Sequence, residues 1–145
     1  IAKLEWPMLL DANGELGVSI NLPGRITKNA NARRVPMHPD LRKALLILAR
    51  ISESGGPVIL SERQRAMSPK SVVNWFKHIY NLAGLEGCSS HSGRRTFVTQ
   101  AARLVHKAGG SLRDVQLLAG HRSIVTTQRY IDGDSDAQRR LVRLI

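Results

Sequence analysis

The first third of the chain shows the pattern of short strands separated by turns. Residues 17–22 alternate apolar and polar side chains, as a half-buried strand does. An Asn-Gly pair at 13–14 is a turn signal, and residues 33–37 form a returning segment whose Pro36 an edge strand tolerates. Together with the stretch that follows Leu4, these patterns predict a small three-stranded antiparallel sheet near the N-terminus.

Beyond residue 38 the apolar spacing becomes helical. A first helix begins at Pro39 and carries its apolar residues on one stripe, formed by Leu41, Leu45, Leu48 and Ile51. A second helix begins at Ser68-Pro69, where a capping side chain precedes a proline. It is predicted to turn five residues inward: Val72, Val73, Phe76, Ile79 and Tyr80.

The last third of the chain is predicted to be helical throughout. One helix begins within Ser89–Ser92 and runs to about Lys107. A shorter one opens on a capping box at Ser111 and ends at Gly120, and amphipathic residues close the chain at 137–145. We therefore expect an α+β fold, mainly α-helical, in which the small sheet packs on one helical domain that spans 1–145.

Composition narrows the class of protein. The 145 residues suffice for one domain with a real core, and a hydrophobic fraction of 42% is ordinary. No apolar run approaches the length of a membrane span, so we expect no membrane partner. The lone Cys88 excludes an internal disulfide and a cysteine-based zinc site. It fits a reducing compartment, so we expect a cytoplasmic protein.

Charge points to a polyanionic partner. Sixteen Arg and six Lys face 11 acidic residues, which gives a net charge of +11 and a pI near 11.1. A field of that sign concentrates polyanions, and a guanidinium can clamp two phosphate oxygens at once. Nucleic acid is the favoured partner, although a soluble domain with a basic surface or a ribosome-type protein has the same balance.

Two short segments in the last third carry side chains suited to phosphate chemistry. His91 and Arg94 lie three residues apart at the start of a predicted helix, so they share a face near free backbone N–H groups. A capping histidine beside a surface arginine is the alternative. His121 follows Gly120, and Tyr130 lies nine residues further on. Alone, the Gly-His pair is typical of a structural turn, and Tyr130 is typical of a packing tyrosine. A phenol has a pKa of about 10, so it must be activated before it can act as a nucleophile.

Taken together, these segments resemble the C-terminal catalytic domain of the tyrosine recombinase (phage integrase) family. His91-Ser-Gly-Arg94 is similar to the family's His-x-x-Arg box. The block from Leu112 through Gly120-His121 to Tyr130 is similar to its leucine-rich, Gly-His and Tyr block. The segment 27–36 resembles the hairpin that carries the family's lysine.

The resemblance implies a role for each of these residues in site-specific DNA recombination. Tyr130 attacks the scissile phosphate and becomes a 3′-phosphotyrosine, and Arg94 neutralises the non-bridging oxygens. Lys28 protonates the departing 5′-oxygen, while His91 and His121 bind the phosphate and move protons. No metal and no other cofactor is implied. DNA contacts are expected from four further residues: Arg95, Arg122, Arg33 and Arg34.

The sequence departs from the family pattern at three points. Gly93 and Ala119 stand where leucine is common, which suggests a variant subgroup. A further arginine of the family falls four positions before Ile1, and the family's N-terminal DNA-clamping domain is not in the sequence either. We therefore expect a truncated catalytic domain that binds DNA but is catalytically impaired alone.

The resemblance leaves other functions open. A non-catalytic DNA-binding module of the same fold and a type IB topoisomerase-like enzyme are the alternatives. For the full-length protein we expect double-stranded DNA as partner, a homo-oligomer (a tetramer) on that DNA, and a bacterial or phage source with nucleoid association. Residues 137–145 are expected to dock on a neighbouring protomer or to fold back on their own domain.

Overall fold

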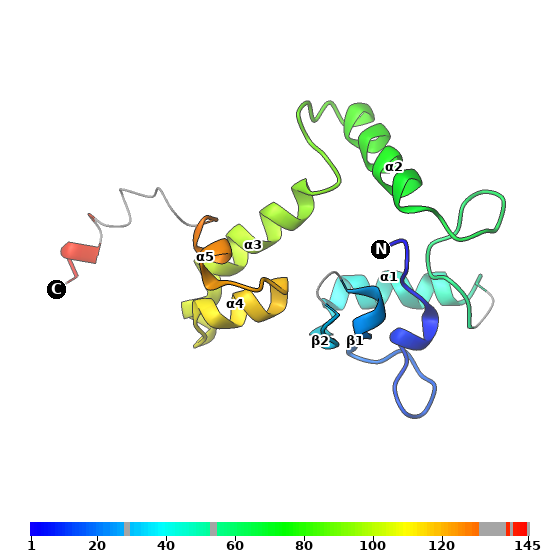
Figure 1. Ribbon diagram of the computed structural model, residues 1–145, viewed down its shortest axis with the longest axis horizontal. Coiled ribbons are helices and arrows are strands. Elements are labelled where there is room, and N and C mark those ends of the chain that lie inside the picture. The colour runs from blue at the N-terminus through cyan, green and yellow to red at the C-terminus, as the bar shows by residue number, and fades with distance from the viewer. Residues whose placement is uncertain (28–29, 53–54, 131–138, 140, 145) are drawn as a thin grey trace. The chain divides into compact units, whose positions relative to one another are not determined.

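The computed structural model describes residues 1–27, 30–52, 55–130, 139 and 141–144 (Figure 1). Lys28 lies outside these residues, as do four of the nine residues of the predicted docking stretch at 137–145. The chain divides into two compact units, Ile1–Ala83 and Gly84–Ile145. We call them the hairpin unit and the helical unit and describe each by itself.

The sheet of the hairpin unit has two strands in the described part of the chain, not the three that were predicted. β1 (Ser19–Leu22) pairs antiparallel with β2 (Arg33–Pro36), with Ser19 opposite Pro36 and Leu22 opposite Arg33. A short 3₁₀ helix, η2 (Gly24–Ile26), follows β1.

The expected third strand is replaced by the 3₁₀ helix η1 (Trp6–Met8). Pro7 explains the difference, because its fixed φ and missing N–H suit the first turn of a helix and remove a donor from a sheet ladder. On either side of η1 the backbone makes only isolated bridges, between Glu5 and Pro57 and between Leu10 and Leu16. The sequence pattern was therefore right about extended backbone and wrong about a continuous strand.

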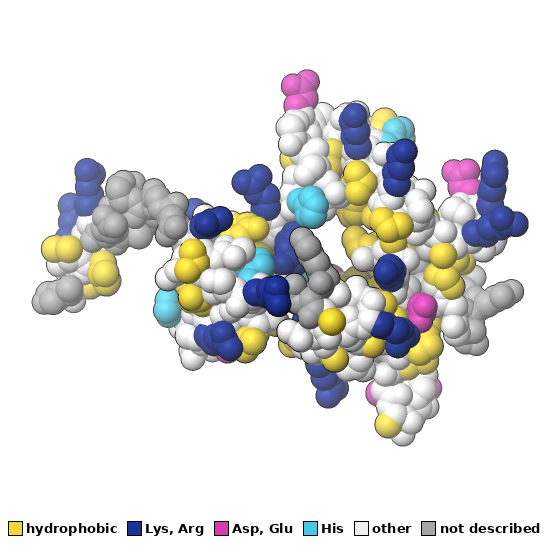
Figure 2. Space-filling model, in the orientation of Figure 1, with side chains coloured by type: hydrophobic (Ala, Val, Ile, Leu, Met, Phe, Trp, Pro, Cys, Tyr) yellow, Lys and Arg dark blue, Asp and Glu magenta, His cyan; other side chains and the backbone are white. Residues whose placement is uncertain are grey.

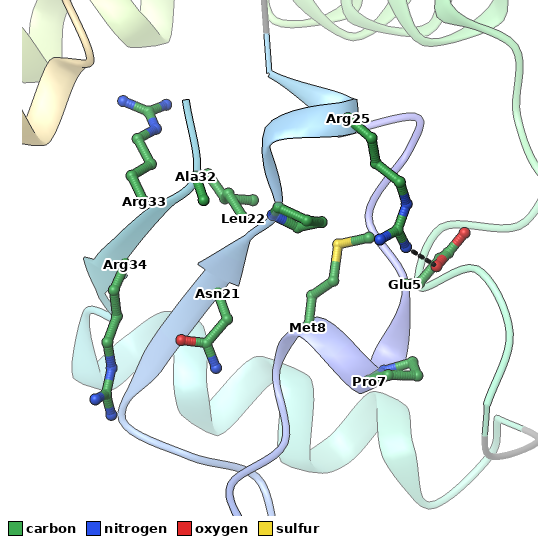
Figure 3. A pocket seen from close by; sticks show the side chains of 10 residues that line it. Glu5, Pro7, Met8, Asn21, Leu22, Arg25, Ala32, Arg33 and Arg34 are labelled. Carbon is green, nitrogen blue, oxygen red and sulfur yellow. Dashed lines mark ion pairs between the residues drawn. The ribbon is translucent and has the colours of Figure 1, made fainter. Parts of the chain in front are cut away.

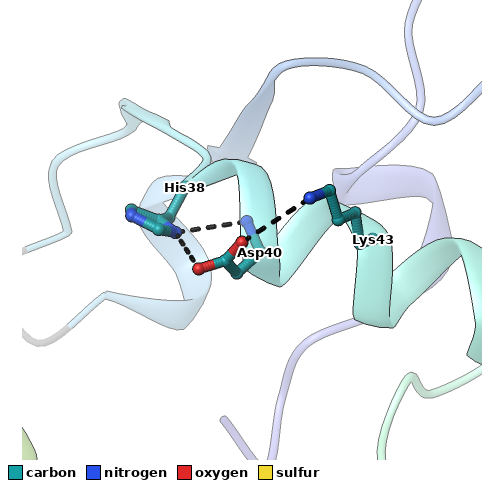
Figure 4. A network of polar contacts seen from close by, with 3 residues as sticks. All are labelled: His38, Asp40 and Lys43. Atoms are coloured by element: carbon teal, nitrogen blue, oxygen red, sulfur yellow. Dashed lines mark hydrogen bonds and ion pairs between the residues drawn. The ribbon is translucent and has the colours of Figure 1, made fainter.

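The helix α1 (Pro39–Ala49) begins on a side-chain cap (Figure 4). His38 Nδ1 accepts a hydrogen bond of 3.2 Å from the Asp40 backbone N–H. The Asp40 carboxylate also lies 3.6 Å from His38 Nδ1 and 4.0 Å from Lys43 Nζ. All three side chains are exposed, so the ion pair between Lys43 and Asp40 adds little stability and the cap defines the start of the helix.

The core of the hairpin unit gathers around η1 and α1. Its buried members are Trp6, Leu9, Leu16, Met37, Leu45 and Val58. Only part of the predicted α1 stripe is inside: Leu45 is buried and Leu48 half-buried, whereas Leu41 and Ile51 are exposed. Ile51 lies beyond the last residue of the helix, so the helical phase no longer places it on the core face.

The helix α2 (Pro69–Leu82) begins as predicted, with the Ser68 hydroxyl accepting from the Ser71 N–H at 3.1 Å. Val72 is buried, and Phe76 stacks on Tyr80 with ring centroids 6.0 Å apart. Two of the five residues predicted to face inward, Val73 and Ile79, are 48% and 38% exposed.

The helical unit consists of α3 (Ser92–Leu104), the 3₁₀ helix η3 (Val105–Ala108), α4 (Leu112–Ala119) and α5 (Ile124–Gln128). In Figure 1 these elements lie against one another, and α4 contacts both α3 and α5. Their buried core is formed by Val98, Ala102, Val115 and Ala119. Across the described residues, no helix is long and apolar enough to span a bilayer.

Candidate functional site

The start of α3 carries the first two candidate residues. His91 is the N-cap, and its side chain makes no capping hydrogen bond. Serine hydroxyls order this end instead: Ser89 Oγ accepts from the His91 N–H at 3.3 Å, and Ser92 Oγ accepts from the Ser89 N–H at 2.9 Å. The His91 imidazole is thus exposed beside a helix start, and it does not act as the structural cap.

Arg94, in the first turn of α3, is tied to the end of α4. Its Nη2 donates to the Ala119 carbonyl oxygen at 2.6 Å. That carbonyl belongs to the last turn of α4, where helix carbonyls lack intrahelical partners and carry partial negative charge. Because one N–H is held there, the guanidinium is oriented while its other donors stay available for an anion.

The turn after α4 positions His121. Gly120 adopts a left-handed backbone with φ of +69°, which only glycine does without strain. The N–H of Gly120 bonds to the Leu117 carbonyl and that of His121 to the Gln116 carbonyl, both at 3.1 Å. This is a Schellman motif, and it explains why a Gly-His pair ends this helix.

The His121 side chain contacts two residues of the following segment. Its Nδ1 lies 2.9 Å from Thr127 Oγ1, and its ring stacks on Tyr130 with centroids 5.7 Å apart and planes 14° apart. α5 makes this possible, because its N-cap Ser123 accepts from the Val125 N–H and the short helix then returns the chain to His121.

Tyr130 is half-buried and packs against the core formed by α3 and α4. Its backbone N–H bonds to the Thr127 carbonyl at 3.1 Å. Tyr130 therefore packs on the core as a structural residue does, while its ring also stacks with the His121 imidazole.

The site lies in a strongly cationic stretch. From His91 to Tyr130 the sequence holds seven Arg or Lys and one carboxylate, Asp114. Arg95 and Arg122 are exposed, and Figure 2 shows Lys and Arg spread over the face in view with few acidic side chains. Hydrogen bonds from Ser111, led by its backbone N–H at 2.8 Å, hold the pKa of Asp114 below its ordinary 3.8.

The remaining candidates belong to the hairpin unit. Lys28 lies outside the described residues. Arg33 is half-buried on β2, and Arg34 donates from Nε to Ser19 Oγ at 2.9 Å across the hairpin. Both arginines line an open cavity of about 560 Å³ over η1 and β1, where Arg25 pairs with Glu5 at 3.7 Å (Figure 3).

Two residues of the site were not singled out from the sequence. Gln116 is 3% exposed; its Nε2 donates to the His121 carbonyl at 3.0 Å, and its Oε1 accepts from Arg113 Nη1 at 2.8 Å. Thr127 is fully buried. The one signal in the sequence was that each polar residue occupies a position on the apolar face of its helix. That signal can be interpreted only when the packing of α4 and α5 is known. No cluster of three or more His, Cys, Asp or Glu suited to a metal occurs among the described residues.

Comparison with known proteins agrees with this fold. The phage integrase family matches residues 1–136. A tyrosine recombinase XerC of Rhodospirillum centenum is 34% identical over 116 residues, which cover 75% of this chain and 32% of the relative. The chain thus spans about a third of that relative's length.

Two solved structures share the fold over 99% of this chain. The XerA recombinase has a TM-score of 0.71 at 24% identity, with 49% of its own chain covered. The Tn1549 transposon integrase, in complex with a circular intermediate DNA, has a TM-score of 0.72 at 16% identity, with 52% covered. The fold is therefore that of recombinases and integrases. The chain belongs to the phage integrase family, that is, to the tyrosine recombinases.

Proposed function

We propose that this chain supplies the catalytic domain of an enzyme that breaks and rejoins DNA in site-specific recombination. The observation that carries the proposal is the stacking of the His121 ring on the Tyr130 ring. His121 directly follows Gly120, and the residue before Gly120, Ala119, provides the carbonyl that binds Arg94. An imidazole, a phenol and an oriented guanidinium thus belong to three helix ends of one compact unit.

The proposed reaction is a transesterification that needs no other reactant. The Tyr130 phenol loses its proton and its oxygen bonds to phosphorus, while the bond from phosphorus to the 5′-oxygen breaks. The 5′-oxygen takes up a proton, and the strand end remains as a 3′-phosphotyrosyl ester. Attack by a 5′-hydroxyl reverses the step and rejoins DNA, because the ester conserves the phosphodiester linkage.

Each remaining residue has a proposed part in that step. Arg94 stabilises the charge that grows on the non-bridging oxygens in the transition state. Stabilisation of this kind by preorganised donors is usually the largest single contribution to catalysis. His91 and His121 bind the phosphate and assist proton movement. Lys28 protonates the leaving oxygen.

Double-stranded DNA is the proposed partner. The net charge of +11 and the exposed Arg95 and Arg122 suit phosphate contacts, which position a protein on DNA without reading its sequence. Arg33 and Arg34 on the hairpin are proposed to contact DNA as well. The integrase of similar fold was solved with DNA bound.

Covalent trapping tests the proposal without knowledge of the target site. The protein encoded by the complete reading frame is incubated with a pool of nicked duplexes of randomised sequence, in which the short cleaved end diffuses away and blocks rejoining. We expect DNA that stays protein-linked after denaturation. Trypsin and nuclease digestion should then give a nucleotide-modified peptide that begins at Tyr130, because Arg129 precedes it, and ends at Arg139.

The chain offers a matched control, because it holds only two tyrosines. Tyr130→Phe should abolish the adduct, whereas Tyr80→Phe on α2 should preserve it. Adducts that persist in Tyr130→Phe would contradict the assignment of the nucleophile. DNA binding without any adduct in the unaltered protein would favour a non-catalytic binding module.

A further inference from the structure

Thr127 lies directly behind the imidazole of the proposed site. It is fully buried on α5, and its Oγ1 is 2.9 Å from His121 Nδ1. Within the described part of the chain, this nitrogen is the only hydrogen-bond partner of the Thr127 hydroxyl. The neighbouring Thr126 on the same helix is exposed, so burial and bonding single out one of two adjacent threonines.

The burial of this hydroxyl decides the direction of the hydrogen bond. A hydroxyl has one hydrogen to donate and lone pairs to accept with. If Thr127 accepted from an Nδ1–H, its own hydrogen would be buried without an acceptor, which is costly away from water. If Thr127 donates, that hydrogen is satisfied. Donation to Nδ1 is therefore the favoured arrangement.

We propose that Thr127 is a positioning residue that holds neutral His121 in the tautomer with its hydrogen on Nε2. A neutral imidazole carries one hydrogen, so an Nδ1 that accepts leaves Nε2 as the donor. This inference rests on the proposed function, in which His121 binds the phosphate.

Other contacts restrict the remaining movements of the same side chain. Gln116 accepts from the His121 N–H through its backbone carbonyl and donates from Nε2 to the His121 carbonyl. Tyr130 lies flat against the ring. These contacts hold the backbone and the ring plane, whereas the Thr127 hydroxyl contacts a ring nitrogen and so bears on which of the two nitrogens carries the hydrogen.

Nuclear magnetic resonance measures the tautomer directly and requires no activity. Long-range proton–nitrogen spectra of the histidine-labelled chain are recorded at about pH 8.5, well above the ordinary histidine pKa of about 6.5. His121→Gln identifies the signals of this residue among the five histidines. We expect a bare Nδ1 and a protonated Nε2 in the unaltered chain and in Thr127→Ser.

Thr127→Val keeps the shape of the side chain and removes the hydroxyl. In this variant the two nitrogen shifts of His121 should move toward each other, as in a mixture of tautomers. Thr126→Val is the matched control and should leave them unchanged. Backbone amide spectra establish that each variant is folded. Should Thr127→Val not fold, the unaltered chain and Thr127→Ser still decide the direction of the hydrogen bond.

The same variants are then placed in the complete protein and tested for the covalent adduct. The rate should fall on the order of tenfold in Thr127→Val and recover in Thr127→Ser, as for residues that orient a reacting group from behind. An unaltered His121 with its hydrogen on Nδ1 overturns the inference. So does a Thr127→Val variant with an unchanged tautomer or an unchanged rate. Adducts formed by Tyr130→Phe overturn the proposed function instead, and the tautomer result stands apart from it.

Discussion

Single residues of the site are held largely by backbone groups. The Arg94 guanidinium donates to a carbonyl at the end of α4. The backbone of His121 is held by Gln116, whose carbonyl accepts from the His121 N–H and whose side-chain Nε2 donates to the His121 carbonyl. Backbone acceptors are placed by whole elements, so their positions are as well defined as the helices. A side chain anchored in this way loses little conformational freedom when an anion binds.

Arg94→Lys tests the value of that anchor. A lysine ammonium acts as a point charge and cannot hold the Ala119 carbonyl while it presents a planar fork to phosphate. We expect the rate of adduct formation to fall about 100-fold, as for the loss of one preorganised donor. Arg95→Lys, at the adjacent exposed position, is the control and should stay close to the unaltered rate. If charge alone mattered at this helix start, Arg94→Lys would keep the unaltered rate. Equal losses in both variants would mean that the hydrogen bond to the Ala119 carbonyl gives Arg94 no special role.

The residues proposed to touch the substrate were identified from the sequence, whereas the residues that contact and support them were not. Arg94, His121 and Tyr130 belong to residue types whose chemistry is visible in any context. Gln116 and Thr127 are common polar types that normally face water. Their importance comes from burial, and burial follows from how α4 and α5 pack on α3.

Among the elements, helix starts were predicted better than sheet extent and helix ends. Ser68 caps α2 and Ser111 opens α4 with a capping box, because both signals are local hydrogen bonds between residues close in sequence. The helix predicted to reach Lys107 ends as α-helix at Leu104 and continues as η3. Nothing local to the sequence marks that change of hydrogen-bond pattern.

The capping box of α4 predicts a pH-dependent stability. Since hydrogen bonds from Ser111 lower the pKa of Asp114, the carboxylate stabilises the fold above its ordinary pKa of 3.8, and this is lost as pH falls through the lowered folded value. Asp114→Asn should therefore lower the free energy of unfolding at about pH 7, and the difference should shrink at about pH 3.

Chemical unfolding followed by circular dichroism at both pH values measures this difference. Glu86→Gln is the control, because Glu86 is exposed and makes no hydrogen bond or ion pair within the described residues. A deficit in Asp114→Asn that is as large at low pH as at neutral pH would rule out the charged carboxylate as its source.

At the scale of the whole molecule, the excess of positive charge is the main feature of the composition. Positive residues outnumber acidic ones by two to one, and they are distributed over both units. The composition predicts a polyanionic partner, because net charge is read directly from sequence, and an integrase of similar fold was solved with DNA.

Salt dependence of DNA binding measures this charge. We expect the logarithm of the association constant to fall linearly with the logarithm of salt concentration, between about 50 and 200 mM, by fluorescence anisotropy. Replacing Arg95 and Arg122 together by glutamine should reduce the slope by about two, one unit for each phosphate contact. Glu86→Gln should leave it unchanged. An affinity insensitive to salt would show that counterion release is not the driving force.

The Ala119 carbonyl that holds Arg94 also affects how tolerant the site is of mutation. Every one of the twenty amino acids carries that oxygen, so no point mutation at position 119 can delete the acceptor, although many can disturb the core around it. Apart from a substitution of Arg94 itself, the anchor is lost through a change that displaces the end of α4, such as a substitution of Gly120. Substitutions at position 119 therefore affect the packing of the core before they affect phosphate binding. In a library randomised at this position, every variant that folds should keep Arg94 oriented.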